Sequence, residues 1–448
     1  MNIGFISLGC SKNRVDTEIM MAILKRAGYK IVNRIEKAEL VIINTCGFIN
    51  DAKEEAIDTI IEIGHLKEAG IVNYIIATGC LAQRYGKELL EEMPELDAVV
   101  GISSFMNIDR IVEMVVKGER LAETPPPPMF FVEKGERILT TPPGSAYLKI
   151  TEGCNNRCSY CAIPLIRGNL RSKSLDDIAK EASFLVEKEK IKELVLVGQD
   201  TAAYGMDLYG KSMLPDVLQI LSEIDCLEWI RIMYLHPNHI SDEIIEKVAL
   251  LEKVVPYLDI PIQHFADDVL KRMNRKHNGE HLKKVITRLR EAKYNLVLRT
   301  TVMVGFPGET EEDFKKLYNF IEETEFDWLG CFAFNPEEGT AAYNMSGQID
   351  DETKQERLSE LMKLQKKITR RKNIGRLNKV ENILISSQID KNLYLGRGYF
   401  QAPEVDGVTL VRSEKPLSKG EFTKVLLKGV REYDIIGVVV AEEDQYIS

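Results

Sequence analysis

Short apolar runs alternate with amphipathic helical stretches along most of this chain, and this alternation limits the possible folds more than any other feature. In the N-terminal part, three apolar runs predict buried strands: Ile3–Leu8, Leu40–Asn44 and Tyr74–Thr78. Helical stretches lie between and after them, at Asp16–Ala27, Ala52–His65, Gln83–Met93 and Ile108–Val116. The pattern predicts a parallel sheet with helices on both of its faces.

Prolines mark the end of this first region, in Thr124–Pro128 and again in Pro142-Pro143-Gly144. Since proline continues neither a helix nor a central strand, we expect a linker here. The alternation resumes from Ala146 to Asn344, with strands expected at Leu194–Val197, Ile230–Tyr234, Tyr257–Ile260, Leu296–Met303 and Gly330–Phe334. About six βα units fit in this length, which predicts a partial barrel rather than the closed eight-stranded form.

The C-terminal part has a different pattern. Asp350–Lys372 predicts one long charged helix. From Lys379 to Tyr446 short alternating runs predict a small all-β barrel, with strands at Asn382–Ser386, Thr409–Arg412, Phe422–Leu427 and Ile435–Val440. The expected fold class is therefore α/β, with an open parallel domain at 1–118, a linker at 119–143, a partial (β/α) barrel at 144–376 and the all-β barrel at 377–446.

Composition and charge limit the location and the binding partners that we expect for the chain. No apolar run approaches the length of a membrane span, and the N-terminus enters a strand without a leader-like segment. Six of the eight cysteines group into motifs rather than a disulfide framework, which indicates a reducing, cytoplasmic location. The net charge of −10 disfavours a surface made for nucleic acid. Two basic stretches, Lys271–Lys293 and Lys363–Arg376, are either solvated helix faces or contacts to a ribonucleoprotein.

Cys154, Cys158 and Cys161 form a CxxxCxxC motif directly after the apolar run Ala146–Ile150. Three thiolates at this spacing can hold three irons of a cubane cluster and leave the fourth iron without a protein ligand. A structural zinc site or a closed electron-transfer cluster would need four ligands. The motif therefore predicts an iron that is open to a small molecule.

Three further cysteines, Cys10, Cys46 and Cys80, each follow one of the predicted N-terminal strands. Because the carboxyl ends of parallel strands lie along one edge of a sheet, these cysteines can converge there on a second open cluster. Glycines beside them (Gly9, Gly47 and Gly79) allow a close approach of the backbone. The alternative is that all three are buried packing residues. Cys226 and Cys331 stand in apolar surroundings, and we expect both in the core.

The CxxxCxxC spacing resembles the signature of radical S-adenosylmethionine (SAM) enzymes. Gly9-Cys10-Ser11-Lys12-Asn13-Arg14-Val15-Asp16-Thr17-Glu18, together with Cys46 and Cys80, resembles the N-terminal domain of the methylthiotransferases. That family has the same three-part order, ending in a TRAM barrel. The resemblance covers essentially the whole chain and implies two 4Fe-4S clusters, one open to SAM and one open to sulfur.

Several segments resemble the branch of this family that modifies an aspartate of small-subunit ribosomal protein number twelve. They are Gly9–Asn13, Arg167–Ser172, Gly198–Thr201, Tyr204-Gly205, Pro261–His264, Glu337–Thr340 and Ala402–Gly407. The C-terminal region from Lys379 to Ser448 holds nine Lys and Arg against eleven Asp and Glu, a net of −2, which suits a protein partner better than RNA. Asn335-Pro336 departs from the Tyr-Ser-like pair common in that branch.

The resemblance implies that SAM, cleaved at the first cluster, yields a radical that takes a hydrogen from the β-carbon of the aspartate. The second cluster would provide the sulfur, methylated by a second SAM. An unactivated C–H bond cannot be deprotonated by a side chain at neutral pH, so a radical step is needed. The implied partners are the ribosomal protein, alone or within the ribosome, and a reductant protein; no membrane is involved, and transfer RNA is disfavoured.

Five residues are candidate SAM contacts. Gly305, Gly308 and Glu309 belong to Gly305-Phe306-Pro307-Gly308-Glu309, which resembles the adenine-side loop of radical SAM barrels, although a plain strand-to-helix turn explains it equally well. Gln199 and Asp200 end a strand and should face the barrel mouth, where they contact SAM or substrate or make a structural hydrogen bond. We assign no role to His236 or His264.

Two alternatives stay open at this point. The first keeps the enzyme class but changes the substrate to a transfer-RNA adenosine, as the two basic stretches would allow. The second is an iron–sulfur electron carrier or sensor without transferase activity. SAM cleavage that depends on Cys154, Cys158 and Cys161 would exclude the second.

Overall fold

A computed structural model describes residues 1–133 and 135–440. The last part of the predicted C-terminal barrel, residues 441–446, lies outside the described residues. The chain divides into two compact units. Unit 1 consists of residues 1–140, 151–172 and 335–343, and unit 2 of residues 141–150, 173–334 and 344–448. In this division the CxxxCxxC segment belongs to the same unit as the N-terminal sheet. No helix of the described residues has both the length and the apolar character to cross a membrane.

Unit 1 is built on a six-stranded parallel sheet with the order β2-β1-β3-β4-β5-β6, as the alternation of the sequence predicts. Its strands are β1 (Asn2–Ser7), β2 (Lys30–Val32), β3 (Leu40–Thr45), β4 (Tyr74–Gly79), β5 (Ala98–Val100) and β6 (Leu121–Glu123). The short strand β6 lies within the segment expected to be a linker.

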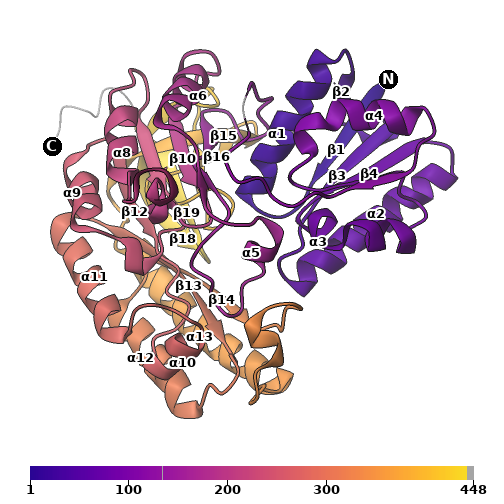
Figure 1. Cartoon of the computed structure of the whole chain (residues 1–448). Helices are drawn as coiled ribbons and strands as arrows, with labels where there is room; N and C mark the ends of the chain where they lie inside the picture. Colours follow the sequence, from indigo (N-terminus) through magenta and orange to yellow (C-terminus); the bar gives the residue numbers. More distant parts are fainter. Residues whose placement is uncertain (134, 441–448) are drawn as a thin grey trace. The chain divides into compact units, whose positions relative to one another are not determined.

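Helices cover both faces of this sheet (Figure 1). They are α1 (Ser11–Arg26), α2 (Asn50–Glu68), α3 (Cys80–Glu92) and α4 (Ile108–Val116), with single 3₁₀ turns at η1 (Ile35–Lys37) and η2 (Phe105–Asn107). Apolar residues of α2 and α3, such as Ile60 and Leu81, pack with Val41 and Ile43 of β3 in one core cluster. Helices α1 and α4 contact each other.

The CxxxCxxC segment of unit 1 is closed by a small antiparallel pair of strands, β8 (Thr151–Glu152) and β9 (Arg171–Ser172). Helix α5 (Ile163–Ile166) lies between them in the chain. The pairing brings the two ends of the segment together, so the cysteines are carried on a loop with a fixed base.

Unit 2 contains the second parallel sheet, with the order β14-β13-β12-β11-β10-β7. Its strands are β7 (Ser145–Lys149), β10 (Glu193–Val197), β11 (Trp229–Ile232), β12 (Val254–Asp259), β13 (Val297–Val304) and β14 (Trp328–Ala333). The strands follow one another in sequence order, and β7 and β14 are the two edges, so this sheet is the open partial barrel that the sequence predicts.

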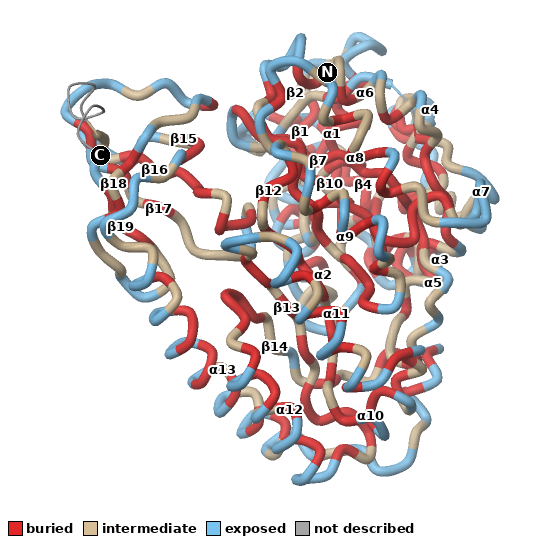
Figure 2. Tube along the Cα trace, turned by 90° about the vertical axis from the view of Figure 1, so that its left-hand side faces the viewer, coloured by how far each residue is buried: buried red, intermediate tan, exposed pale blue. Residues whose placement is uncertain are grey.

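Helices connect these strands: α6 (Leu175–Glu187), α7 (Met206–Tyr209), α8 (Leu214–Ser222), α9 (Asp242–Leu250), α10 (Asp267–Arg272), α11 (Gly279–Ala292) and α12 (Glu311–Thr324). The long helix α13 (Asp351–Ile374) follows the last strand of the sheet, β14. There are 3₁₀ turns at η3 (Thr201–Ala203) and η4 (Pro237–His239), and a further one, η5 (Ala341–Asn344), begins in the segment 335–343 of unit 1. Buried and exposed residues alternate along α13 (Figure 2), because Leu361, Leu364 and Ile368 form one apolar stripe of the long charged helix.

The C-terminal strands close into a five-stranded barrel with the order β15-β16-β17-β19-β18. They are β15 (Val380–Asp390), β16 (Leu393–Arg397), β17 (Thr409–Arg412), β18 (Phe422–Arg431) and β19 (Asp434–Val439). Four of the five were predicted. Within unit 2, buried Glu193 of β10 accepts from Arg231 of β11 at 2.8 Å and from Arg397 of β16 at 2.5 Å, which ties the small barrel to the parallel sheet.

The expectation that both remaining cysteines lie in the core was wrong for Cys226. It is exposed, at a turn where its φ angle is +63°, while the neighbouring Leu227 provides the buried side chain. Cys331 of β14 is half-buried, and burial raises the pKa of its thiol to about 12.

Candidate functional site

Cys10, Cys46 and Cys80 each stand at the carboxyl end of a strand, and those strands, β1, β3 and β4, are neighbours in the sheet of unit 1. Cys10 is the N-cap of α1, Cys46 directly follows β3, and Cys80 is the first residue of α3. Parallel strands and short connections therefore bring together three cysteines that lie far apart in sequence.

Glycines make room for this approach. A side-chain carbon at Gly9 would lie 2.8 Å from Cys46 Cβ and 3.0 Å from Cys46 Sγ. One at Gly47 would lie 2.8 Å from the backbone of Leu81, and one at Gly79, whose φ angle is +97°, would overlap Asn44 Oδ1 and Thr45 O. Each of the three glycines lies where a side chain would push the cysteine-bearing strand ends apart.

The electrostatics of the three thiols differ. Burial alone would raise the pKa of Cys10, but the charges of Lys12 and Arg167 and nearby backbone amides bring it below its ordinary value. Burial raises the pKa of Cys46, and it raises the pKa of Cys80 to about 12. A positive ion or cluster that binds these sulfurs as thiolates therefore has to overcome desolvation, most of all at Cys80.

Arg167 is the charged side chain that meets this cysteine site. Its Nε donates to Cys80 Sγ at 3.3 Å, and its Nη2 donates to Asn13 Oδ1 at 2.5 Å. On its other side the guanidinium bonds Glu152 Oε2 at 2.6 Å and Asp16 Oδ2 at 3.2 Å. The side chain is 1% exposed, so these contacts form in the absence of competing solvent.

Sequence reasoning identified neither Arg167 nor Asn13 as a site residue. Asn13 Nδ2 donates to Leu8 O at 3.2 Å and to Thr45 O at 2.9 Å. Leu8 lies two positions before Cys10, and Thr45 lies directly before Cys46. The sequence offers one signal: the charged Arg167 directly follows the apolar stretch Ile163–Ile166, which suggests a buried ion pair. The partner could not be found this way, because Cys80 lies 87 positions away.

Cys154, Cys158 and Cys161 are half-buried and lie between β8 and α5 of the same unit. The amide of Cys161 donates to Cys158 O at 3.1 Å, and the amide of Asn156 lies 3.5 Å from Cys154 Sγ. Gly153, at a φ angle of +72°, has no room for a side chain against Asn169 O. The loop thus presents three sulfurs from one short, backbone-constrained segment.

The spacing of the sulfurs bears on the kind of metal group they can hold. Sulfurs around one tetrahedral zinc lie about 3.8 Å apart, since a Zn–S bond is about 2.3 Å. Among the described residues, the groups of three metal-ligating side chains with all ligand atoms within 4.8 Å of one another are Asp200, His236 and His239, and Asp16, Glu133 and Glu152. Neither group contains a cysteine, and each cysteine set provides three thiols, one ligand fewer than a structural zinc site needs.

The segment 335–343 packs within unit 1 as well. Glu337 Oε2 accepts from Arg84 of α3 at 2.6 Å and from Lys53 of α2 at 2.7 Å. The amide of Ala342 donates to Ser159 O, inside the cysteine loop, at 2.8 Å. Glu337, which belongs to the family-like run Glu337–Thr340, therefore anchors a loop that also supports the CxxxCxxC segment.

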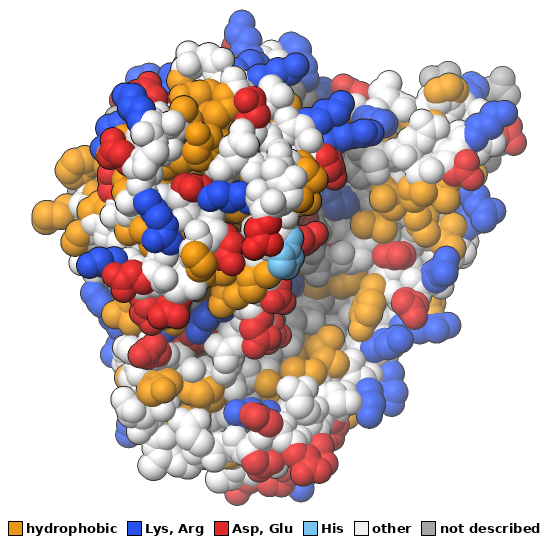
Figure 3. All heavy atoms as spheres, turned by 90° about the vertical axis from the view of Figure 1, so that its right-hand side faces the viewer, with side chains coloured by type: hydrophobic (Ala, Val, Ile, Leu, Met, Phe, Trp, Pro, Cys, Tyr) orange, Lys and Arg blue, Asp and Glu red, His pale blue; other side chains and the backbone are white. Residues whose placement is uncertain are grey.

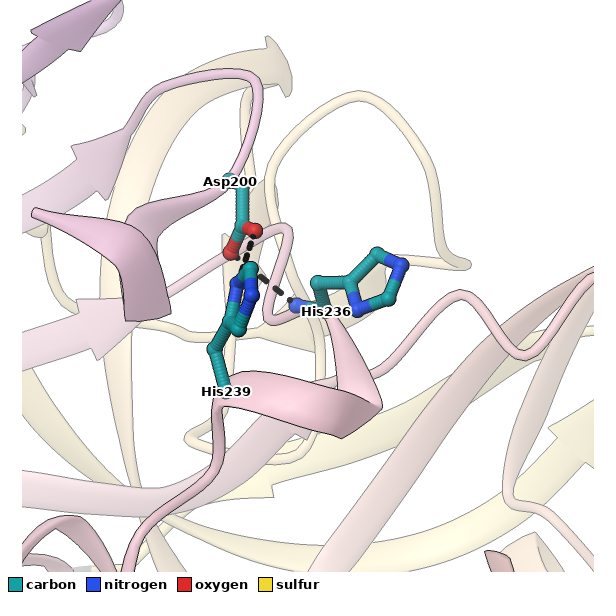
Figure 4. Close-up of side chains that lie close together, drawn as sticks. All are labelled: Asp200, His236 and His239. Atoms are coloured by element: carbon teal, nitrogen blue, oxygen red, sulfur yellow. Dashed lines mark hydrogen bonds and ion pairs between the residues drawn. The ribbon is translucent and has the colours of Figure 1, made fainter. Parts of the chain in front are cut away.

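In unit 2, the predicted SAM contact Asp200 lies beside two histidines (Figure 4). Its Oδ2 lies 2.7 Å from His239 Nδ1, and its Oδ1 accepts from the His236 amide at 3.3 Å. His236 Nδ1 accepts from the amide of Asn238 at 3.3 Å, and burial lowers the pKa of His236 well below its ordinary value. His236 is thus neutral with its proton on Nε2. Gln199 is half-buried next to this group.

The loop after β13 contains Gly305, Gly308 and Glu309. Gly305 and Gly308 have φ angles of +71° and +75°. Glu309 is buried; its Oε2 accepts from the Phe306 amide at 3.0 Å and its Oε1 from Arg357 at 3.2 Å. Burial raises the pKa of Glu309 to about 7. The carboxylate fastens its own loop, the glycines give the loop its left-handed turns, and the role of these residues toward SAM stays a prediction.

The two basic stretches are largely engaged with acidic or carbonyl groups of unit 2. Arg371 and Lys372 pair with Glu325, and Arg376 pairs with Asp327 at 2.6 Å. In the other stretch, Arg288 pairs with Asp242 at 2.6 Å. On the face of the molecule seen in Figure 3, acidic and basic side chains are interspersed. The ion pairs favour the solvated-helix explanation for the basic stretches.

Three known families match successive parts of the chain. Residues 148–321 match the Radical SAM superfamily, residues 2–101 match the uncharacterized protein family UPF0004, and residues 378–440 match the TRAM domain. The radical SAM superfamily implies a 4Fe-4S cluster and SAM as cofactors.

Curated relatives match over almost the full length. A protein of Syntrophomonas wolfei subsp. wolfei, called ribosomal protein uS12 methylthiotransferase RimO, is 59% identical over 437 residues, which cover 98% of this chain and 99% of that protein. A protein of Clostridioides difficile (strain 630) with the same name is 45% identical over 442 residues, 99% of each chain.

Solved structures show the same kind of fold at low identity. The radical SAM methyltransferase TsrM from Kitasatospora setae aligns with a TM-score of 0.55 and 12% identity, covering 76% of this chain and 77% of that one. The cobalamin-dependent SAM radical enzyme OxsB aligns with a TM-score of 0.51 and 12% identity, covering 82% of this chain and 56% of that one. At this identity the likeness concerns the fold alone.

Proposed function

This chain belongs to the RimO family of radical SAM methylthiotransferases, and on that premise we propose that it adds a methylthio group to the β-carbon of an aspartate in ribosomal protein uS12. The observation that carries the proposal is the 59% identity to a uS12 methylthiotransferase over nearly the whole length of both chains. The two cysteine sets of unit 1 support it, because transfer of a methylthio group to carbon needs both a radical source and a sulfur source.

We propose that Cys154, Cys158 and Cys161 hold the 4Fe-4S cluster that binds SAM, and that Cys10, Cys46 and Cys80 hold a second one. The donor sets fit, since each provides three thiols and leaves one iron open, and glycines clear the space around the second set. When bound, cluster and SAM supply the one-electron chemistry that an unactivated C–H bond requires.

The remaining roles belong to the chain's own groups. Strands β1, β3 and β4 fix three sulfurs at one edge, and the β8–β9 pair fixes the base of the other cysteine loop. Gln199 and Asp200, at the end of β10, and Gly305, Gly308 and Glu309, after β13, are the proposed SAM contacts. They lie at the carboxyl ends of parallel strands, where barrels of this kind bind ligands.

The protein substrate is supported by charge. The C-terminal region carries a net charge of −2, and several Lys and Arg of the basic stretches of unit 2 pair with acids. A surface that follows a phosphate backbone needs unpaired Lys and Arg. We therefore propose a basic protein partner for the barrel, a reductant protein as electron donor and a cytoplasmic location, where the ribosome is.

The test is an anaerobic turnover with reconstituted enzyme, SAM and reductant, in which uS12 and transfer RNA compete in one tube. Mass spectrometry of both should find the methylthio group on an aspartate of uS12. The group on a transfer-RNA adenosine would contradict the substrate but keep the enzyme class. If neither deoxyadenosine nor a methylthio product forms, an iron–sulfur carrier or sensor becomes the better explanation.

A further inference from the structure

We propose that Arg167 is a positioning residue of the N-terminal cysteine site, and that its hydrogen bond to Cys80 sets the reduction potential of the cluster held there. The inference rests on the proposed function, because it assumes a cluster at Cys10, Cys46 and Cys80. Nothing in the family comparison assigns a role to Arg167; the assignment comes from its contacts in unit 1.

The guanidinium is fixed from three elements of the chain. Cys80 is the first residue of α3, Asn13 belongs to α1, and Glu152 to β8, and all three are bonded within 2.5–3.3 Å. Asp16 of α1 adds a contact at 3.2 Å. Because the acids take the Nη atoms, the Nε–H is left aimed at sulfur rather than at a carboxylate.

A second line of contacts extends from Arg167 to the other two strand ends. Asn13, whose Oδ1 accepts from Arg167, also donates to Leu8 O and Thr45 O, close before Cys10 and Cys46 in sequence. Asn13 Oδ1 lies 3.6 Å from Cys80 Sγ as well. The Arg167–Asn13 pair thus contacts all three strand ends that carry the cysteines, so we expect a change at Arg167 to affect the whole site.

The charge of Arg167 has a defined effect on a cluster. Arginine stays protonated in proteins, so the positive charge is permanent. Three thiolates make a cluster negative, and each added electron makes it more so. Hydrogen bonds to the sulfurs and nearby positive charge favour the reduced form and raise the potential. Without such a group, a site as buried as that of Cys80 would resist reduction.

The experiment uses the full chain in a parent variant with Cys154→Ala, Cys158→Ala and Cys161→Ala, which leaves only the N-terminal site able to hold a cluster. The cluster is titrated with reductant and followed by electron paramagnetic resonance. Arg167→Gln removes the charge, and Arg167→Lys keeps the charge but cannot keep the same Nε hydrogen bond. Arg110→Gln is the matched control, since Arg110 pairs with Glu123 at an exposed position of the same unit.

We expect the midpoint potential of Arg167→Gln to fall by at least the equivalent of a tenfold change in the reduction equilibrium, 59 mV for one electron. The midpoint potential of Arg167→Lys should fall less, and that of Arg110→Gln should match the parent. An unchanged midpoint in Arg167→Gln, at full cluster content, would overturn the inference.

If Arg167→Gln assembles no cluster, the lysine variant decides in the same way: a lower midpoint supports the role and an unchanged one overturns it. A parent variant that holds no cluster at all would contradict the proposed second cluster itself, and the role of Arg167 with it. Iron analysis of the parent separates that failure from the others.

Discussion

At the scale of single residues, several buried charged groups meet a partner of opposite sign. Glu193 of β10 is the most enclosed example in unit 2, with Arg231 at 2.8 Å and Arg397 at 2.5 Å, and it accepts from Ser145 at 2.8 Å. Burial alone would raise the pKa of Glu193, but the two arginines lower it to about 2.

The ion pairs of Glu193 with Arg231 and Arg397 predict that unit 2 loses stability in acid. The pKa of Glu193 is about 2 when folded and about 4.3 when unfolded, so its stabilisation is present above pH 4.3 and is lost as the pH falls toward 2. Glu193→Gln should remove that pH dependence and cost about 3–5 kcal/mol at neutral pH, since two buried arginines lose their partner.

The measurement is urea unfolding between about pH 2 and pH 7, followed by tryptophan fluorescence, because this interval includes both pKa values. Both tryptophans, Trp229 and Trp328, lie in unit 2. The exposed Glu246→Gln is the control and should behave like the native chain. A native-like midpoint for Glu193→Gln across the whole range would show that the pair contributes nothing to stability.

Gly79 carries a second prediction at this scale. Gly79→Ala would place a carbon against Asn44 Oδ1 and Thr45 O at a φ angle of +97°, so β3 and β4 must separate near Cys46 and Cys80. We expect loss of the N-terminal cluster, measured as a fall from about eight to about four irons per chain after reconstitution.

Gly28→Ala is the matched control for Gly79→Ala. Gly28 has a similar φ angle of +90°, but open space surrounds it, so only the backbone penalty of about 1–2 kcal/mol applies. It should keep its iron. Equal iron content in the two variants would mean that crowding at the strand ends does not govern cluster binding.

At the scale of elements, long and regular patterns were predicted and short or non-local features were not. The strand β3 and the helix α13 follow from continuous apolar and helical patterns. Strands β2, β5 and β6 have three residues each, too few for a periodicity, and β16 contains Gly396 next to its last residue. The six cysteines follow from spacing and strand ends, whereas the Arg167–Cys80 contact depends on how distant segments pack.

The segment 335–343 gives a prediction at this scale. Glu337→Gln should loosen it, because Arg84 and Lys53, which meet at Glu337 Oε2, would lose their shared charge partner. We expect hydrogen exchange of residues 335–343 to rise at least tenfold, which corresponds to about 1.4 kcal/mol of local stability. Glu338→Gln is the control, since Arg84 contacts only the backbone oxygen of exposed Glu338. Equal exchange in both variants would rule out Glu337 as the anchor.

At the scale of the whole molecule, the chain combines membership of the RimO family with a charge distribution that disfavours RNA binding. We expect transfer RNA to bind only at the non-specific level, with dissociation constants of about 10⁻⁴–10⁻⁶ M at physiological salt. Glu414→Lys with Glu421→Lys, both exposed on the C-terminal barrel, should strengthen RNA binding and steepen its salt dependence. Filter binding over a salt series tests this; tight, salt-steep binding by the native chain would contradict the protein-substrate proposal.

The central claim is that one chain holds two separate clusters on two sets of three cysteines, and iron analysis of anaerobically reconstituted protein tests it most directly. The native chain should bind about eight irons, and each triple alanine variant, at Cys10, Cys46 and Cys80 or at Cys154, Cys158 and Cys161, about four. The exposed Cys226→Ala should stay at the native value. A triple variant that keeps all its iron, or one that loses all of it, would contradict the two-site account.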